Sequence, residues 1–340
     1  MRKRLRLLLI PLAVVLVGGL VGLGFGVTTV RRCWPRTRGR ISVDGLKDEV
    51  VVVRDDWGIP HIYASNDHDL FFAQGYVHAQ DRYWQMEFWR RIGSGRLSEV
   101  LGESALGQDR FIRTVGWHRA AQRDVEQMDE ASLVVLEDYA AGVNAYVASH
   151  RNRLGLEFKV LGLTGTEVEI EPWTPLDSVA WGKVMAWDLS GNRTEELLRA
   201  HIADRMGNKA VEELIPPYSN DYPVIVSGEV TGASLRAVPD VAVGKLALGQ
   251  GEYLGSNNWV VAGERTASGM PPLANDPHLG IHMPSLWYEI GLHCDPVGPE
   301  CPYNVVGASF ASTPGVIIGH NDRIAWGVTN LGPDVQDLFV

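Results

Sequence analysis

Cysteine is scarce in this sequence, and positive charge is scarce outside its first 40 residues. The 340 residues include 3 cysteines, too few for a small domain held together by disulfide bonds. Residues 1–40 contain nine of the 31 lysines and arginines and no acidic residue, which leaves 22 basic against 41 acidic side chains, a formal charge of −19, in the remainder. Because such a chain would repel phosphate backbones, the composition argues against a nucleic-acid partner.

The motifs of several common enzyme classes are also absent. There is no Gly-x-Ser-x-Gly elbow, His-Glu-x-x-His zinc motif, P-loop or dinucleotide fingerprint after a strand. His278 and His282 have the spacing of helical metal ligands, but the prolines and glycine around them argue against a helix. The other histidines considered are interpreted as surface or capping residues: His61, His68, His78, His118 and His201.

The N-terminal segment has the pattern of a membrane anchor. Four basic residues precede an uncharged run, residues 7–30, and Arg31 and Arg32 follow it. This run of 24 residues is long enough for a helix to cross a hydrocarbon core about 30 Å thick. We expect an uncleaved anchor, with the remaining chain on the periplasmic or extracellular side. A cleaved signal peptide and a buried core helix are the alternatives.

The cysteines bear on the same question of compartment, because disulfides persist outside the cytoplasm. Cys294 and Cys301 flank a turn-rich loop that is compatible with either a disulfide or two free thiols. Cys33, near the end of the apolar run, would remain unpaired.

Along the chain, helical patterns come mostly before strand patterns. Strands are expected over 50–53 and 61–64, and helices over 67–91 (capped by Ser65 or Asn66), 131–149 and 194–206 (ended by Gly207). Further strands are expected over 258–262, 273–274, 286–293, 305–310, 316–318 and 324–329. This order predicts an α+β protein. We divide it into residues 1–40 (anchor or signal with a basic linker), 41–218 (helix-rich), 219–255 (connector) and 256–340 (strand-rich).

Gly255 and Ser256 open the strand-rich part, and several motifs accompany them. In chain order these motifs are Gly58–Ile62, Phe72–Tyr76, Ala79–Met86, Trp187–Asn192, Gly255–Gly263, Arg265–Gly269, Leu273–Leu279, Ile318–Asn321, Ala325–Asn330 and Asp334–Asp337. Together they resemble the penicillin acylase family of N-terminal-nucleophile (Ntn) hydrolases over residues 45–340. The resemblance implies an αββα four-layer sandwich, incomplete here, with residues 41–218 and 256–340 as parts of its first and second chains.

The resemblance also implies a precursor that cuts itself between Gly255 and Ser256. Ser256 would then begin a chain, and its free α-amine, with an ordinary pKa of about 7.7–8.0, would be a usable base near neutral pH. One residue would supply both nucleophile and base. The implied activity is hydrolysis of linear amides, such as the side chains of β-lactams or N-acyl homoserine lactones.

Four further positions match the family's active site. The backbone N–H of Asn330 corresponds to an oxyanion donor, and His278 to a residue that orients the amine or a water; a turn histidine is the alternative. Leu279 and Ile318 correspond to the acyl pocket, although both also suit a core. A second donor, an Asn side chain, and a functional Arg are expected after Val340, so we interpret the sequence as a fragment or a truncated precursor.

Many family members bind one structural calcium ion between their two chains, and no organic cofactor. The matching positions here are Asp334, the carbonyl of Gln336, Asp337 and Glu196, with Glu195 as an alternative to Glu196. The expected partners are thus a small-molecule amide, the membrane through residues 7–30, and the other chain of the same precursor. An inactive truncated fragment and a non-catalytic, membrane-anchored binding module are the competing interpretations.

Overall fold

The structure is a computed structural model that describes residues 2–190, 192–216, 255–330 and 335. It divides into two compact units: unit 1 comprises Met1–Trp181 and Met283–Trp326, and unit 2 comprises Gly182–His282 and Gly327–Val340. The predicted connector, residues 219–255, lies outside the described residues except for Gly255.

Helices precede most of the strands, which confirms the predicted α+β class. The helical elements are α1 (Arg2–Arg32), α2 (Asp67–Ser94), α3 (Ser98–Leu101), the 3₁₀ helix η1 (Gly102–Ala105), α4 (Leu106–Val115), α5 (Trp117–Glu126), α6 (Glu130–His150), α7 (Leu156–Leu163), α8 (Pro175–Leu189), α9 (Asn192–Met206), α10 (Asn208–Leu214) and the 3₁₀ helix η2 (Gly263–Arg265). The strands are β1 (Val51–Arg54), β2 (Pro60–Ala64), β3 (Gly255–Val260), β4 (Leu273–His278), β5 (Trp287–Cys294), β6 (Asn304–Phe310), β7 (Ile318–Asn321) and β8 (Ala325–Trp326).

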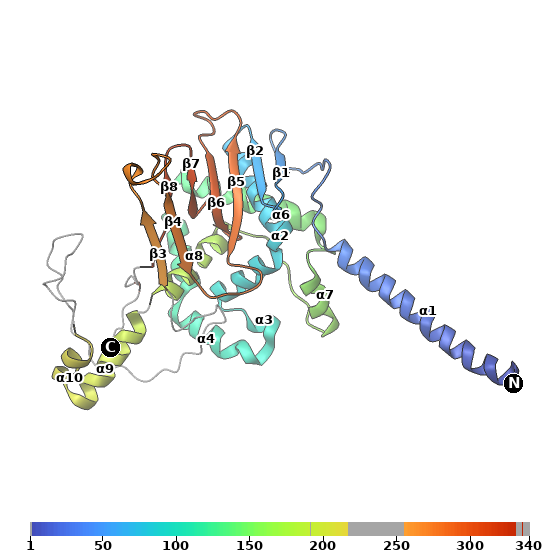
Figure 1. Ribbon diagram of the computed structural model, residues 1–340. Coiled ribbons are helices and arrows are strands. Elements are labelled where there is room, and N and C mark those ends of the chain that lie inside the picture. Colours follow the sequence, from blue (N-terminus) through green and yellow to red (C-terminus); the bar gives the residue numbers. More distant parts are fainter. Residues whose placement is uncertain (1, 191, 217–254, 331–334, 336–340) are drawn as a thin grey trace. The chain divides into compact units, whose positions relative to one another are not determined.

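A six-stranded mixed sheet forms one layer of unit 1 (Figure 1). Its strand order is β1-β2-β5-β6-β7-β8, and each neighbouring pair is antiparallel except β2 and β5. In that parallel pair, His61 lies opposite Gly291 and Ala64 lies opposite Cys294. The sheet therefore joins strands from both sides of the predicted cleavage bond.

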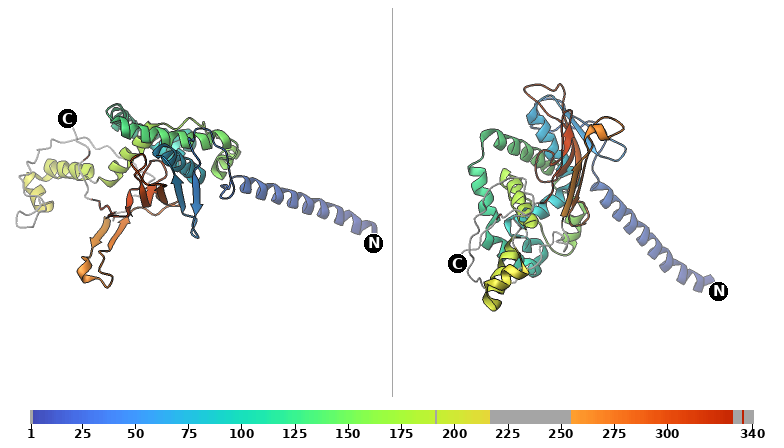
Figure 2. Two further views of the ribbon diagram at one scale, coloured as in Figure 1. Left: turned by 90° about the horizontal axis from the view of Figure 1, so that it is seen from above. Right: turned by 60° about the vertical axis from the view of Figure 1, so that its left-hand side comes forward.

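Helix α2 lies between this sheet and α6 (Figure 2). On its sheet side, Leu70 belongs to an apolar cluster with Ile290, and on its α6 side, Met86 belongs to a second cluster with Val143. The predicted inward face is buried: Phe72, Tyr76, Ala79, Tyr83 and Met86. Because α2 has partners on both sides, it also buries positions that a single amphipathic face would leave in solvent.

The contact between α2 and α6 brings backbone against backbone. A Cβ atom at Gly75 would lie 2.0 Å from the Tyr139 carbonyl oxygen, and one at Gly142 would lie 1.8 Å from the Phe72 carbonyl oxygen. Any larger residue at either position would push the two helices apart. This close approach is what the glycine pair contributes to the core.

The ends of α2 have clear local causes. Asn66, one of the two predicted caps, accepts a hydrogen bond from the backbone N–H of Asp69 (2.9 Å). Gly95 ends the helix in the left-handed region (φ 65°), which glycine adopts without strain. The helix extends from residue 67 to 94, three residues beyond the predicted end.

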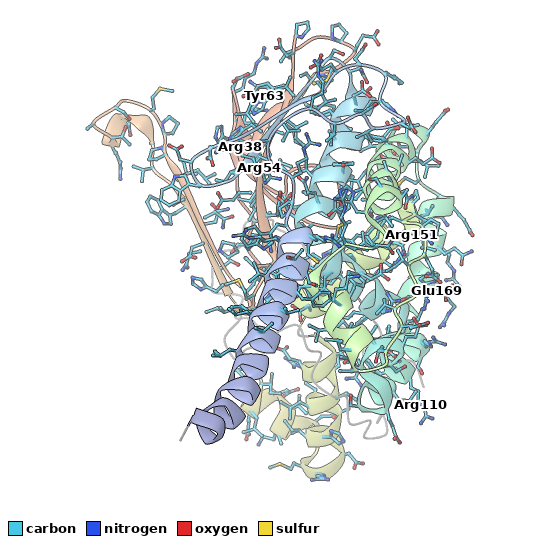
Figure 3. The ribbon with its side chains drawn as sticks, turned by 90° about the vertical axis from the view of Figure 1, so that its right-hand side faces the viewer. Arg38, Arg54, Tyr63, Arg110, Arg151 and Glu169 are labelled. Carbon is cyan, nitrogen blue, oxygen red and sulfur yellow. A yellow bond between two sulfur atoms is a disulfide. The ribbon has the colours of Figure 1, made fainter. Side chains whose placement is uncertain are left out.

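A polar cluster ties β1, α2 and β5 together. Arg54 on β1 donates to both carboxylate oxygens of Asp81 on α2 (2.8 and 3.0 Å), and the Tyr288 hydroxyl on β5 donates to the same carboxylate. In the side view of Figure 3, Arg54 and Tyr63 lie with the strands, and Arg151 lies with the helices.

The interpretation of His78 as a surface or capping residue is wrong. Its side chain is fully buried, with Nδ1 2.9 Å from the Tyr139 hydroxyl and Nε2 3.1 Å from the Ser309 hydroxyl. His78 lies in the middle of a helix that is covered on two sides, which a one-face pattern does not reveal. The other predicted elements appear with shifted bounds: β3 is 255–260 rather than 258–262, and β4 is 273–278 rather than 273–274. β7 is 318–321 rather than 316–318, and β8 is shorter than predicted.

Two cysteines pair. Cys294, at the end of β5, forms a disulfide with Cys301, and Cys33 is free. Of the two alternatives for this pair, the structure therefore shows the disulfide. Both paired cysteines are buried in the cluster on the sheet side of α2.

The predicted apolar run falls within α1, whose side chains are described from Leu16 onward. Among the residues described, none of the helices combines the length and the apolar character that crossing a membrane requires.

Unit 2 contains the hairpin of β3 and β4. The strands are antiparallel, with Gly255 opposite His278, Ser256 opposite Pro277 and Val260 opposite Leu273. In the connection between them, the Thr266 hydroxyl donates to the carbonyl of Gly263 (2.9 Å). This hairpin positions the residues considered next.

Candidate active site

Ser256 lies near the start of β3 and is half-buried. Its hairpin partner is Pro277, so Ser256 shares one face of the hairpin with every second residue along β3 and β4. That face includes Asn258 and, opposite it, Asn275. Gly255, the other half of the predicted cleavage bond, begins the strand.

The segment after β8 lies on β3 at Ser256. The Thr329 hydroxyl donates to the Ser256 carbonyl oxygen (2.9 Å). The side-chain amide of Asn275 donates to the carbonyl oxygens of Asn257 (3.0 Å) and Val328 (2.9 Å) and accepts the Val328 N–H (2.9 Å). Asn330, the predicted oxyanion donor, directly follows Thr329, so the structure brings it to the neighbourhood of Ser256.

His278 ends β4, directly opposite Gly255. Its Nε2 lies 2.9 Å from Asp276 Oδ2, and both side chains are exposed. Strand alternation places these two side chains on the face opposite to that of Ser256. The structure thus brings His278 next to the predicted cleavage bond along the backbone, and its role in catalysis stays a prediction.

The remaining predicted residues belong to both units. Leu279 follows β4 in unit 2 and is partly buried, and Ile318 is a partly buried residue of β7 in unit 1. Glu196 is partly buried on α9, whereas Glu195 is exposed. Asp334, Gln336 and Asp337 lie outside the described residues. Within the described part of the chain, no three His, Cys, Asp or Glu side chains form a group that could hold a metal ion.

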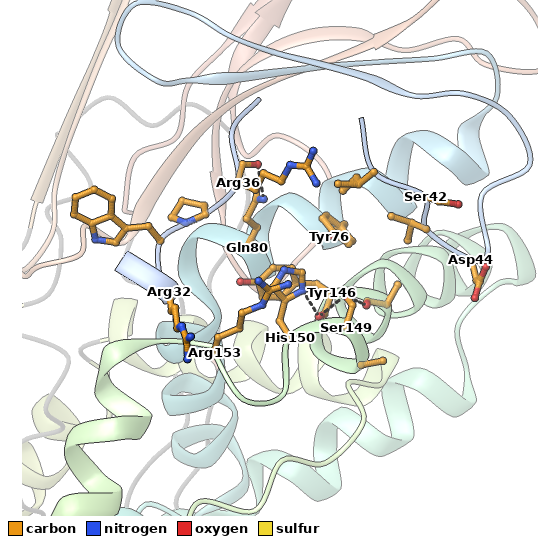
Figure 4. Close-up of a pocket in the computed structure, with 16 residues that line it drawn as sticks. Arg32, Arg36, Ser42, Asp44, Tyr76, Gln80, Tyr146, Ser149, His150 and Arg153 are labelled. Atoms are coloured by element: carbon orange, nitrogen blue, oxygen red, sulfur yellow. Dashed lines mark hydrogen bonds between the residues drawn. The ribbon is translucent and has the colours of Figure 1, made fainter. Parts of the chain in front are cut away.

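A cavity of about 550 Å³ lies elsewhere, between the end of α1 and α6 in unit 1 (Figure 4). Its walls include Arg32, Arg36, Tyr76, Tyr146 and Arg153. None of the predicted site residues belongs to the described residues that line it. The candidate site is therefore defined by the hairpin and the 327–330 segment, and not by this cavity.

Sequence reasoning gave no role to Asn275 or Thr329, although both belong to motifs that it singled out. Asparagine is depleted in strands, so Asn275 inside a strand is a signal that its side chain has a specific use. Thr329 carries no comparable signal, because threonine is common in strands.

Comparison with known proteins agrees with the motifs. A family model described as penicillin amidase matches residues 49–340. The acyl-homoserine lactone acylase QuiP of Pseudomonas aeruginosa is 34% identical over 316 residues, 90% of this chain and 36% of that protein. The penicillin acylase 2 proenzyme of a Pseudomonas species is also 34% identical, over 90% of this chain and 39% of that protein.

The penicillin G acylase of Escherichia coli is 27% identical, over 86% of this chain and 40% of that protein. A solved structure of a thermostable penicillin G acylase from Alcaligenes faecalis aligns with 54% of this chain and 98% of its own, at 27% identity and a TM-score of 0.42. The chain thus spans about two fifths or less of the length of these three curated relatives. The penicillin amidase family model matches most residues of this chain, and the chain therefore belongs to the penicillin amidase family.

Proposed function

We propose that this chain carries the nucleophile of an amidase that hydrolyses linear amides, with Ser256 acting after the Gly255–Ser256 bond is cut. One observation carries the proposal: the strand that begins with these two residues is tied, through the Ser256 carbonyl, to the segment that ends in Asn330. Family membership and the names of the relatives, which are acylases of homoserine lactones and penicillins, support it. We also propose that the chain forms part of the family's αββα four-layer sandwich.

The proposed maturation is an acyl shift followed by hydrolysis. The Ser256 hydroxyl attacks the Gly255 carbonyl carbon, the C–N bond between the two residues breaks, and the proton passes to the departing nitrogen. Water then hydrolyses the ester, which leaves a carboxylate on Gly255 and a free amine on Ser256. One of the relatives is named a proenzyme, in keeping with such a step.

The proposed turnover uses the same atoms. The α-amine, directly or through a water, takes the proton of the Ser256 hydroxyl as this attacks the amide carbonyl, and it returns the proton to the leaving amine. The backbone N–H of Asn330 stabilises the oxyanion. Water then releases the acyl group from Ser256. The substrates proposed are β-lactam side-chain amides or N-acyl homoserine lactones.

The test of this proposal is the N-terminus of the mature protein. Mass spectrometry and Edman degradation of the full-length protein should find two chains, the second beginning at Ser256. Ser256→Ala should remain uncut and inactive, whereas Ser256→Cys should still cut but turn over slowly. Ser268→Ala is a matched control, since the Ser268 hydroxyl hydrogen-bonds within its own turn, to Thr266 and Met270. An active protein whose residue 256 is still joined to residue 255 would refute the mechanism.

A structural calcium site is proposed alongside the catalytic one. Glu196, Asp334, Asp337 and the carbonyl of Gln336 would supply oxygen donors, the ligand type that calcium prefers. Of these four residues, the structure describes Glu196. Its partial burial favours Glu196 over the exposed Glu195 as the calcium ligand. Chelation should lower the melting temperature of wild type and of Glu195→Gln but not of Glu196→Gln; an equal response in all three would contradict the assignment.

The predicted localisation also stays a proposal. The uncharged run of residues 7–30 supports an anchor, with the amidase on the periplasmic or extracellular side. Retention of the full-length protein in membranes after alkaline carbonate washing would support the anchor, and release would favour a cleaved signal.

A further inference from the structure

Three polar contacts and one close approach fasten residues 327–329 to the β3–β4 hairpin. Thr329 reaches the Ser256 carbonyl, and Asn275 bridges Asn257 and Val328. All of these groups lie on or beside the hairpin face that carries Ser256. The segment is thus held by Ser256 of β3, the predicted nucleophile, and by Asn275 of β4.

The side chain of Asn275 meets the hydrogen-bonding needs of two backbones at once. Its amide donates to one carbonyl on β3 and to one on the 327–329 segment, and its oxygen accepts the Val328 N–H. Only an amide of this size offers two N–H donors and one acceptor from a single planar group. Aspartate has the same shape but would direct negative oxygen at both carbonyls.

Gly327 makes this arrangement possible. A Cβ atom there would lie 2.7 Å from Asn258 Nδ2 and 2.8 Å from Asn275 Oδ1. Because the Asn275 amide is held by three hydrogen bonds, it could not move aside without losing them. The chain therefore passes close over the hairpin at Gly327, just before the tied residues Val328 and Thr329.

We propose that Asn275 and Thr329 are positioning residues that fix the backbone N–H of Asn330 relative to Ser256. Both act through the backbone of the segment that ends in Asn330. The inference rests on the proposed function, since it assigns to these ties the geometry of the oxyanion site. A donor displaced from the developing oxyanion loses most of its effect on the rate, and loss of one such donor lowers kcat about 10²–10³-fold.

The first test is Asn275→Asp in the full-length protein, with kcat expressed per Ser256 N-terminus counted by Edman degradation. We expect kcat to fall about 10²-fold while KM changes by less than about threefold, because the lost interaction acts in the transition state. The matched control is Asn144→Asp. Asn144 on α6 makes the same kind of bridge, donating to the Trp173 carbonyl (2.9 Å) and accepting the Trp173 N–H (2.7 Å). This control should lose stability but keep kcat.

The second test separates the hydroxyl of Thr329 from its shape. Thr329→Val removes the hydrogen bond to Ser256 with little change in volume, whereas Thr329→Ser keeps the hydroxyl. The valine variant should lose kcat, and the serine variant should recover most of it. If the Gly255–Ser256 bond of Asn275→Asp is not cut, the comparison of Thr329→Val with Thr329→Ser decides whether the inference holds.

Wild-type kcat in both Asn275→Asp and Thr329→Val would overturn the inference while leaving the proposed function intact. So would an equal loss in Asn275→Asp and Asn144→Asp, because it would reduce the effect to general destabilisation. An active wild type with no N-terminus at Ser256 would instead refute the proposed function.

Discussion

His78 lies in the interior of unit 1, between the hydroxyls of Tyr139 and Ser309. Burial lowers the pKa of its imidazole to about 3, and the positive charge of Arg82 contributes in the same direction. The folded protein therefore holds this ring neutral at pH values where the unfolded chain, with an ordinary pKa of about 6.5, binds a proton.

This difference predicts an acid-sensitive stability. The unfolded state binds more protons below about pH 6.5, so the free energy of unfolding should fall by up to about 1.4 kcal/mol per pH unit as the pH drops from there toward 3. His78→Gln keeps a donor and an acceptor but does not titrate. Urea unfolding between pH 4 and 7 should show a shallower pH dependence in this variant than in wild type; parallel curves would contradict the prediction.

At the residue scale, the sequence predicted some roles and missed others for a physical reason. The roles of Gly255 and Ser256 were predicted from the family resemblance of several separate motifs, and they stay a prediction. His78 was misinterpreted because its partner Ser309 lies 231 residues away in the sequence. Asn275 was passed over because its partner Val328 lies 53 residues away. The use of a polar side chain in an interior depends on tertiary neighbours, which a local pattern does not contain.

At the scale of one element, the C-terminal end of α2 carries a buried charge cluster. Glu87 is fully buried and contacts both Arg90 and Arg91, and it accepts a hydrogen bond from the Tyr83 hydroxyl (3.2 Å). The two guanidinium groups also donate to backbone carbonyls of residues 169–172. Glu87 is thus the carboxylate that both buried cations share, with Asp177 3.9 Å from Arg90 and Glu99 3.4 Å from Arg91.

Replacing that carboxylate should be costly. Glu87→Gln leaves two buried cations without their shared counter-charge, and we expect it to lower the free energy of unfolding by about 3–5 kcal/mol. The same substitution at Glu213, which pairs with exposed Lys209 on α10, should lower it by less than about 1 kcal/mol. Denaturant titration of the two variants tests the contrast, and similar losses would disprove it.

Prediction of the elements depended on their length and their surroundings. The long helices over α2 and α6 were predicted because their apolar spacing repeats over many turns. The ten-residue helices α4 and α5 were not, since helices this short depend on packing for most of their stability. For α2 the existence of the helix was predicted correctly, but its burial on a second side was not.

At the scale of the whole molecule, unit 1 draws on both sides of the predicted cleavage bond. β2 pairs with β5 across that bond, and Gln74 on α2 bridges Gly315 by donating to its carbonyl (3.0 Å) and accepting its N–H (2.9 Å). The patterns predicted each strand separately, but not the parallel pairing of β2 with β5, because register between distant strands is set by packing.

These contacts predict that cutting does not separate the products. The two chains should co-elute in gel filtration under native conditions and come apart in denaturant, with uncut Ser256→Ala eluting as one chain in both. Separation in native buffer would show that the shared sheet alone does not hold them.

The parallel pair of β2 and β5 has a kinetic consequence. In an uncut chain its two strands are tethered, so the pair forms at a rate that does not depend on protein concentration. Once the tether is severed, forming the pair becomes a bimolecular association, and recovery after denaturation should slow on dilution. Cutting would then make unfolding of the mature protein effectively irreversible at low concentration. The lifetime of the mature protein would be set by its unfolding rate.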